Sequence, residues 1–187
     1  MSKYIKVIGN YLKISFKKLF KKVNFSGSKV QSFSKFTELN LAKNSNVCFG
    51  RNIQSDGFCR IITTADAELS IGSKTYFNNG CTVSCMKKVT IGDNCLFGPN
   101  VLVCDNNHKF TAKEGVSFQH NTDEISIGNN CWIASNAVIL KGVTIGNNCV
   151  IGTGCIIKEN VADGSIVTAH IEQHINKIED KQIERKD

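Results

Sequence analysis

The sequence contains a single proline among 187 residues, so proline-marked turns cannot organise this chain. No apolar stretch approaches the roughly 20 residues that a membrane span needs. The N-terminus lacks the uninterrupted apolar core and small-residue cleavage site of a secretory signal. The nine cysteines are odd in number and accompany no such signal, which favours a reduced, cytoplasmic protein over a disulfide framework.

Acidic residues are absent from residues 1–23, which contain seven lysines. The whole chain has 23 basic and 16 acidic residues, so removing these lysines leaves 16 of each sign in residues 24–187. The body of the protein is therefore neutral, and we expect no nucleic-acid groove on it.

Residues 1–23 predict a basic amphipathic helix, because apolar residues recur there at three- and four-residue steps with lysines mostly between them. Such a helix either docks on its own domain or a neighbouring subunit, or lies on an anionic membrane surface. The sequence leaves these alternatives open, and the second one would place a cytoplasmic protein at the inner face of the membrane.

Aliphatic side chains recur at every sixth position of IGNNCWIASNAVILKGVTIGNNCVIGTGCII, residues 127–157. A small residue follows each of them four places later. A period of six fits neither an amphipathic helix nor a hairpin sheet, but it suits very short strands joined by tight corners. Coils of this kind stack about 4.8 Å apart and pair through their backbones. We therefore predict an all-β solenoid whose repeats lie within residues 41–161.

The phase of the repeat changes along the chain. Upstream of Leu69 no register is defined, and after Val89 the phase slips by two and resumes at Ile91. Five cysteines occupy the small position of the repeat, where a thiol is an apolar filler: Cys81, Cys95, Cys131, Cys149 and Cys155.

The repeat is interrupted between Val103 and Ile127. Residues 104–126 carry Lys109, Gly115 and Asn121 where the period calls for core residues. This predicts a loop that leaves the solenoid, and loops of such length are usually functional. The expected organisation is a helix over 1–23, a repeat β-helix over 24–164 with the loop at 104–126, and a C-terminal strand and short helix over 165–187.

Repeats and loop together resemble the hexapeptide-repeat acyltransferases, with galactoside, maltose, nodulation-sugar and capsular-polysaccharide O-acetyltransferases closest in style. The resemblance covers residues 41–161 and is absent from the first 23 residues. It implies a left-handed parallel β-helix and a homotrimer with active sites between subunits. It also implies acetyl-coenzyme A as co-substrate, a sugar or glycan acceptor, and no metal.

The resemblance carries a catalytic and an acceptor site onto this chain. IGDNCLFGPNVLVCDNNH matches the family stretch that ends in the catalytic histidine, which falls on His108. YFNNG, residues 76–80, matches the segment that binds the acceptor sugar, which implies Asn78 with Tyr76 beside it. Asp105 is a further candidate substrate contact, which either orients the imidazole or caps a turn.

The coenzyme A site is implied by IGNNCWIASNAVI, whose tryptophan falls on Trp132, with Ser135, Thr153 and Gly154 lining the groove. Independently of the resemblance, Trp132 precedes a core position by one residue, so alternation along a strand turns it outward. The Gly-x-Pro-Ala-like segment that commonly follows the last coil in the family is missing here, where the chain reads IVTAHIEQHI.

Acetyl transfer to an alcohol needs a base, because the hydroxyl is a poor nucleophile at neutral pH, and histidine has a suitable pKa. The sequence thus favours an acetyl-coenzyme A-dependent O-acetyltransferase of a sugar hydroxyl, in surface polysaccharide or glycoconjugate synthesis, with direct transfer. A covalent route through Cys104 is the mechanistic rival.

Three other functions stay open at this point. The same base could serve N-acetylation of an amino sugar nucleotide. A metal-dependent β-helix enzyme of the γ-carbonic-anhydrase type would need three converging histidines, but His108 and His120 lie twelve positions apart. A non-catalytic β-helix scaffold would need neither the interruption at 104–126 nor coenzyme A.

Overall fold

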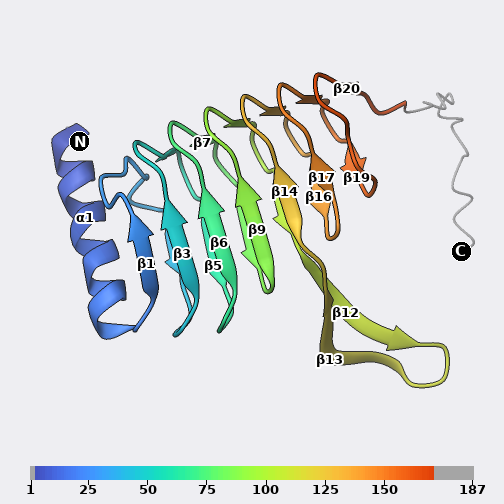
Figure 1. Cartoon of the computed structure of the whole chain (residues 1–187), viewed down its shortest axis with the longest axis horizontal. Coiled ribbons are helices and arrows are strands. Elements are labelled where there is room, and N and C mark those ends of the chain that lie inside the picture. Colours follow the sequence, from blue (N-terminus) through green and yellow to red (C-terminus); the bar gives the residue numbers. More distant parts are fainter. Residues whose placement is uncertain (1–2, 171–187) are drawn as a thin grey trace, which may run out of the picture.

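The computed structural model describes residues 3–170, which form a parallel β-solenoid with a helix at its N-terminal end (Figure 1). The left-handed parallel β-helix implied by the resemblance is the fold of the chain. The predicted N-terminal helix is α1 (Lys3–Phe20). Of the predicted C-terminal elements the strand is present, as β20 (Ile166–Val167), whereas the helix falls outside the described residues.

Three six-stranded parallel sheets form the sides of the solenoid. Sheet A contains β1 (Asn24–Gly27), β3 (Asn46–Phe49), β6 (Glu68–Ile71), β9 (Lys88–Ile91), β14 (Ile125–Ile127) and β17 (Thr144–Ile145). Sheet B contains β4 (Gln54–Ser55), β7 (Tyr76–Phe77), β10 (Leu96–Phe97), β15 (Trp132–Ile133), β18 (Val150–Ile151) and β20. Sheet C contains β2 (Glu38–Asn40), β5 (Arg60–Thr63), β8 (Thr82–Cys85), β11 (Leu102–Cys104), β16 (Val138–Leu140) and β19 (Ile156–Ile157).

The core consists of columns of side chains, one from each strand of a sheet. In sheet B, Phe77 and Phe97 stack with ring centroids 4.7 Å apart, and Ile133 and Ile151 continue the column above them. In sheet C the column consists of Leu39, Ile61, Val83, Val103, Ile139 and Ile157, none of them more than 5% exposed. The five cysteines at the small position are also buried, as their role as fillers requires.

The coils differ in length, which explains why the repeat has no register upstream of Leu69. Val47 pairs with Leu69, 22 positions later, and Leu69 pairs with Val89, 20 positions later. Ile127 pairs with Ile145, 18 positions later, which is three repeats of six. The first of these coils is therefore four residues longer than three hexapeptides, and the second is two residues longer. The two-residue slip in the phase of the repeat at Val89 marks the end of the last long coil.

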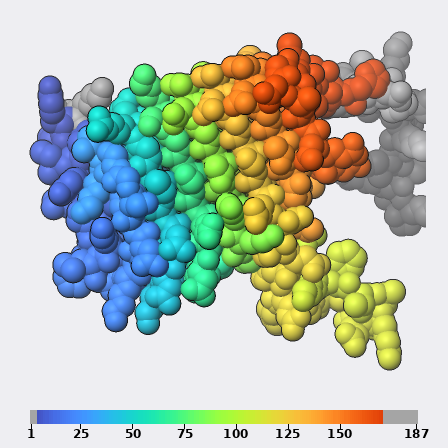
Figure 2. Space-filling view, viewed as in Figure 1, coloured from blue at the N-terminus to red at the C-terminus, as the bar shows by residue number. Residues whose placement is uncertain are grey.

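The interruption of the repeat is a β-hairpin of β12 (Asn106–Thr111) and β13 (Gly115–Thr122), which projects from the solenoid (Figure 1). Figure 2 shows this yellow-green segment protruding from the body of the molecule. Its ends meet at the solenoid wall, where Asp123 N donates to Asp105 O over 2.9 Å. The excursion is narrower than the predicted 104–126, because Cys104 still pairs in sheet C and Ile125 is already a core residue.

Helix α1 covers the N-terminal end of the stack (Figure 1). Ile14 is fully buried, and Asn10 Nδ2 donates to Phe33 O over 3.0 Å. The helix is therefore docked on its own domain, as one of the two expectations had it. Within residues 3–170, no helix has the length and apolar character needed to cross a bilayer.

We predict opposite effects of two glycine-to-alanine substitutions. A Cβ on Gly128 would lie 2.7 Å from the backbone carbon of Gly146, because adjacent coils touch at this corner. Gly9, on α1, has nothing within 4 Å of the corresponding position. Gly128→Ala should lower the free energy of unfolding by more than about 1 kcal/mol, whereas Gly9→Ala should raise it by about 0.5–1 kcal/mol. Urea unfolding followed by circular dichroism measures both, and an unchanged midpoint for Gly128→Ala would contradict the close stacking.

Candidate active site

His108 lies on β12 and is exposed on the projecting hairpin. Its Nδ1 lies 3.0 Å from the carbonyl oxygen of Ser117, on the opposite strand. A carbonyl only accepts hydrogen bonds, so Nδ1 must carry the proton, and in the neutral ring Nε2 is then the free acceptor. The hairpin thus holds the imidazole in the tautomer that a general base needs.

His120 supports this ring from β13. The two residues pair across the hairpin, and their ring centroids lie 4.3 Å apart with the planes tilted by 38°. The contact limits rotation of the His108 side chain. Two imidazoles are fewer than the three protein ligands of a catalytic zinc site, so a metal here would need a further ligand from another copy of the chain.

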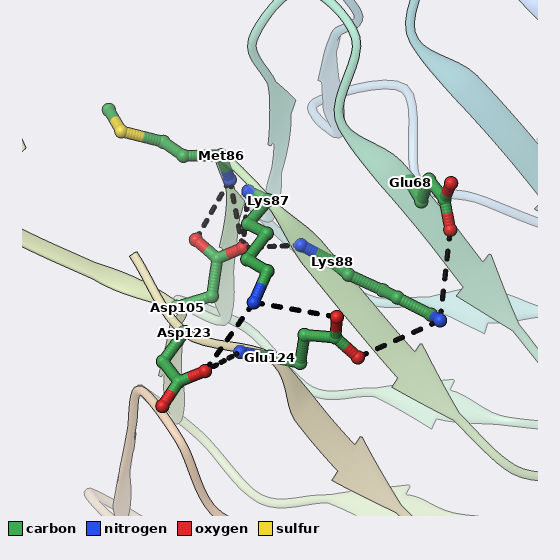
Figure 3. Close-up of polar contacts among 7 residues, drawn as sticks. All are labelled: Glu68, Met86, Lys87, Lys88, Asp105, Asp123 and Glu124. Carbon is green, nitrogen blue, oxygen red and sulfur yellow. Dashed lines mark hydrogen bonds and ion pairs between the residues drawn. The ribbon is translucent and has the colours of Figure 1, made fainter. Parts of the chain in front are cut away.

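Asp105 occupies the base of the hairpin and is completely buried. Its carboxylate accepts hydrogen bonds from the backbone N–H groups of Met86, Lys87 and Lys88 over 2.7–3.0 Å, as Figure 3 shows. The Asn106 side chain donates a further bond of 3.0 Å. Asp105 therefore anchors the turn between β8 and β9. Its position gives no support to the expected substrate contact or to orientation of the imidazole, a task that falls to the Ser117 carbonyl.

Ion pairs tie the returning strand of the hairpin to the same turn (Figure 3). Lys87 lies 3.6 Å from Asp123 and 3.5 Å from Glu124, and Lys88 lies 3.7 Å from Glu124. Each pair is exposed and contributes little alone. Together with the buried Asp105 carboxylate, they hold both ends of the hairpin on one turn.

Tyr76 and Asn78 lie at the side of the solenoid formed by sheet B. The Tyr76 hydroxyl donates to Asp56 Oδ2 over 2.8 Å, and burial together with this bond raises the pKa of Tyr76 to about 12. The Asn78 side chain accepts from the backbone N–H of Asn79 over 2.8 Å, which fixes it at the corner after β7. Its amide nitrogen has no bond within the described residues and is free to donate to a ligand.

The expected coenzyme residues gather at the same edge, which we call the B–C corner: the residues that link each sheet B strand to the next sheet C strand. Ser135 and Gly154 occupy it in successive coils, with the Gly154 N–H donating to Ser135 O over 3.0 Å, and Thr153 precedes Gly154. Trp132 lies just before this corner on β15 and is 53% exposed, so the predicted outward orientation is confirmed.

His108 lies apart from these residues. The hairpin leaves the solenoid between sheets C and A, whereas the acceptor and coenzyme residues lie on sheet B and the B–C corner. A groove of about 750 Å³ runs over the N-terminal half of sheet A, but none of the expected site residues line it. Within the described residues, the chain alone therefore does not bring His108 together with the expected acceptor and coenzyme residues.

Two segments of the repeat region match known protein families. Residues 124–159 match the family described as bacterial transferase hexapeptide (six repeats), and residues 88–104 match the hexapeptide repeat of succinyl-transferase. Within these residues the chain is built of hexapeptide repeats.

Curated relatives of this hexapeptide-repeat protein include several acetyltransferases. Galactoside O-acetyltransferase of Escherichia coli is 37% identical over 78 residues, which cover 42% of this chain and 38% of the relative. Nodulation protein L of Rhizobium meliloti is 34% identical over 76 residues, covering 41% and 42%. Polysialic acid O-acetyltransferase of Neisseria meningitidis is 33% identical over 81 residues, covering 42% and 37%. The matches span about two fifths of the length of these relatives.

Solved structures share the fold over most of the chain. The polySia-specific acetyltransferase NeuO superimposes with a TM-score of 0.54 at 20% identity, over 87% of this chain and 90% of its own. AntD, an N-acyltransferase from Bacillus cereus in complex with dTDP and 3-hydroxybutyryl-CoA, gives 0.64 at 17% identity, over 82% and 81%. At these low sequence identities, the structural similarity establishes the fold of the chain but not the reaction that it catalyses.

Two features of the site were missed by sequence reasoning. The contact of His108 with Ser117 and His120 required the register of the hairpin, and residues 104–126 were predicted only as a loop. Their alternating run VSFQHNT was the available signal for a strand. No sequence pattern predicted the hydrogen bonds that three backbone N–H groups donate to Asp105, because these groups lie almost twenty positions before it in the chain.

Loss of the Asp105 carboxylate should destabilise the protein. Asp105→Asn replaces one acceptor oxygen by a donor that faces backbone N–H groups, which should lower the free energy of unfolding by about 2–4 kcal/mol. Asp123→Asn is the matched control, since its side chain is 57% exposed and forms a surface ion pair and one exposed hydrogen bond from the Glu124 N–H, so it should cost less than about 1 kcal/mol. Equilibrium urea unfolding compares the two variants, and equal losses would show that Asp105 is not the anchor.

Proposed function

We propose that this protein is an acetyl-coenzyme A-dependent O-acetyltransferase that acts on a sugar hydroxyl, in the synthesis of a surface polysaccharide or glycoconjugate. The observation that carries the proposal is the imidazole of His108, exposed on a hairpin and fixed by the Ser117 carbonyl with Nε2 free to accept a proton. The acetyltransferases among the curated relatives support acetyl as the transferred group and a sugar as the acceptor.

The proposed reaction is a direct transfer. Nε2 of His108 removes the proton from the acceptor hydroxyl as its oxygen bonds to the thioester carbonyl carbon. The carbonyl electrons move onto oxygen, and backbone N–H groups stabilise this oxyanion. When the tetrahedral intermediate collapses, the C–S bond breaks, the thiolate of coenzyme A leaves, and the imidazolium returns its proton to sulfur. Acetyl-coenzyme A is a co-substrate here, and these steps require no metal.

The acceptor and coenzyme sites are assigned to the B–C corner and the adjoining face of sheet B. Asn78, with Tyr76 beside it, positions the acceptor hydroxyl through its free amide N–H. Trp132 offers an exposed aromatic face to the coenzyme, and Ser135 lines the groove beside it. At Thr153 and Gly154 the corner is open, since nothing lies within 4 Å of an ideal Cβ on Gly154.

A homotrimer would unite the two halves of the site. Apolar side chains project outward from the later strands of sheets B and C, among them Leu96, Trp132, Leu140, Ile156 and Ile166. The outward side chains of sheet A are mostly polar. Burying the apolar faces of B and C between copies would favour association, and would let the hairpin of one subunit bring His108 to Asn78 and Trp132 of the next.

We also propose a cytoplasmic location. All nine cysteines are unpaired, and seven of them are buried in the solenoid, which fits a reducing compartment. The acceptor could alternatively be the amine of an amino sugar nucleotide, because the same base would take a proton from nitrogen. An acceptor screen containing both sugars and amino sugar nucleotides separates these outcomes.

Replacing His108 should abolish most of the transfer. With the best acceptor from such a screen, His108→Ala should lower kcat by about 10²–10⁴-fold, because it removes the base. Coenzyme A release and acetylated product are measured together by mass spectrometry. Cys104→Ala is the control, because Cys104 is the nucleophile of the covalent rival and its thiol only donates to Asn106 O over 3.2 Å. A large loss in the cysteine variant with a small loss in the histidine variant would reverse the assignment.

Binding of coenzyme A should change the fluorescence of Trp132, the single tryptophan of the chain. Because its indole is half exposed at the proposed groove, titration with coenzyme A should quench the emission in a saturable way. Ser135→Trp is a steric control that should block the groove and weaken binding measured by calorimetry. A linear response identical to that of free tryptophan would remove Trp132 and the B–C corner from the coenzyme site.

A further inference from the structure

Helix α1 packs on the solenoid through its more polar side, on which Ile14 is the fully buried apolar side chain. The first coil lies at the end of the stack, so several of its backbone carbonyls have no coil beyond them to pair with. Asn10 donates to Phe33 O over 3.0 Å, Lys18 Nζ donates to Phe25 O over 3.2 Å, and Lys13 Nζ donates to Thr37 O. The polar side of α1 thus supplies hydrogen-bond donors to backbone carbonyl groups at this end of the β-helix.

This orientation leaves the apolar side of the helix in water. Eight large apolar side chains of α1 are each between 47% and 81% exposed, and we call them the outer face of α1: Tyr4, Ile5, Ile8, Tyr11, Leu12, Phe16, Leu19 and Phe20. They fall on one side of a helix with a period of 3.6, so the patch is continuous along its length. Figure 1 shows that α1 lies across the end of the stack, so this face looks outward along the solenoid axis.

The surroundings of the outer face are positively charged. No acidic residue precedes Glu38 in the sequence. Lys18, Lys21 and Lys22 are exposed at the C-terminal end of α1, and Lys35 is exposed beside its N-terminal half, where it lines a hollow together with Ile5. The apolar face is therefore bordered by cations at both ends, with no carboxylate among residues 3–37 to neutralise them.

We propose that α1 docks flat on a lipid bilayer with anionic headgroups, its outer face in the acyl boundary and its bordering lysines on the headgroups. An apolar helical face flanked by lysines is the pattern of an interfacial helix, and each lysine near an anionic surface adds favourable energy. The proposal does not depend on acetyl transfer.

A second copy of the chain is a poorer occupant of this face. Pairing two outer faces would bring together two segments that carry only positive charge, which opposes association. An anionic bilayer instead supplies the opposite charge along with an apolar medium.

Vesicle co-sedimentation of the full-length protein tests the proposal. The protein should bind vesicles of phosphatidylcholine mixed with phosphatidylglycerol, bind pure phosphatidylcholine much more weakly, and lose affinity at high salt. The double variant Ile8→Gln, Leu12→Gln removes two side chains at the centre of the outer face, each about 60% exposed. Glutamine keeps a high helix propensity, so the helix should persist while binding falls by more than about tenfold.

The matched control is Val116→Gln, Phe118→Gln, which replaces two exposed apolar residues of the hairpin, 71% and 97% exposed. It should bind vesicles like the wild type. Lys21→Gln, Lys35→Gln keeps the apolar face and should weaken binding about tenfold to anionic vesicles only. Circular dichroism verifies folding of each variant.

Three results would overturn the proposal. The first is equal binding to both vesicle types or to neither. The second is a loss of binding in the hairpin variant and not in the helix variant. The third is a lower oligomeric state of the helix variant in analytical ultracentrifugation with vesicle binding unchanged, which would assign the outer face to a second copy.

Discussion

Backbone pairing between successive coils is the constraint on which this structure depends. Each short strand finds partners only in the coils before and after it, so the coils must keep one register from β1 to β17 in sheet A. The core columns follow from that register, because paired positions put like side chains above one another. Coils of 22, 20 and 18 residues all obey it, since the added residues lie between a sheet C strand and the next sheet A strand. There the strands themselves lengthen, from three and two residues in β16 and β17 to four each in β8 and β9.

The same constraint explains how the chain can carry a long excursion without losing its fold. Val89 in β9 pairs with Ile125 in β14, 36 positions later, as if the hairpin were not there. The carboxylate of Asp105 makes this possible by binding three backbone N–H groups of the preceding coil at the point where the chain departs. A buried charge of this kind is tolerated because its oxygens are fully hydrogen-bonded. The candidate base is thereby displayed on a projecting hairpin whose two ends are hydrogen-bonded to the solenoid.

Much of this fold was predictable, because few protein folds place a core residue at every sixth position of the chain. The isoleucines from Ile127 to Ile157 defined the core columns, and alternation along a strand turned Trp132 outward. The early coils were not predictable, since a 22-residue coil hides the period that the 18-residue coils display. At the site, the residue type and position of His108 were visible in the sequence, but its orientation by Ser117 and the role of Asp105 depend on contacts that only the folded chain creates.

Helix α1 shows why the amphipathic pattern of a helix does not by itself determine which side packs against the rest of the protein. An amphipathic helix next to a hydrophobic core is expected to bury its apolar side, because that removes the most apolar area from water. The end of a β-solenoid is a different surface, since it exposes carbonyl groups that need donors, and an unpaired buried carbonyl costs free energy of its own. Asn10, Lys13 and Lys18 supply those donors, so the lysine side turns inward and the apolar side turns out. The chain thereby closes one end of its stack at the expense of an exposed apolar face, and this is the face that we propose to dock on a bilayer.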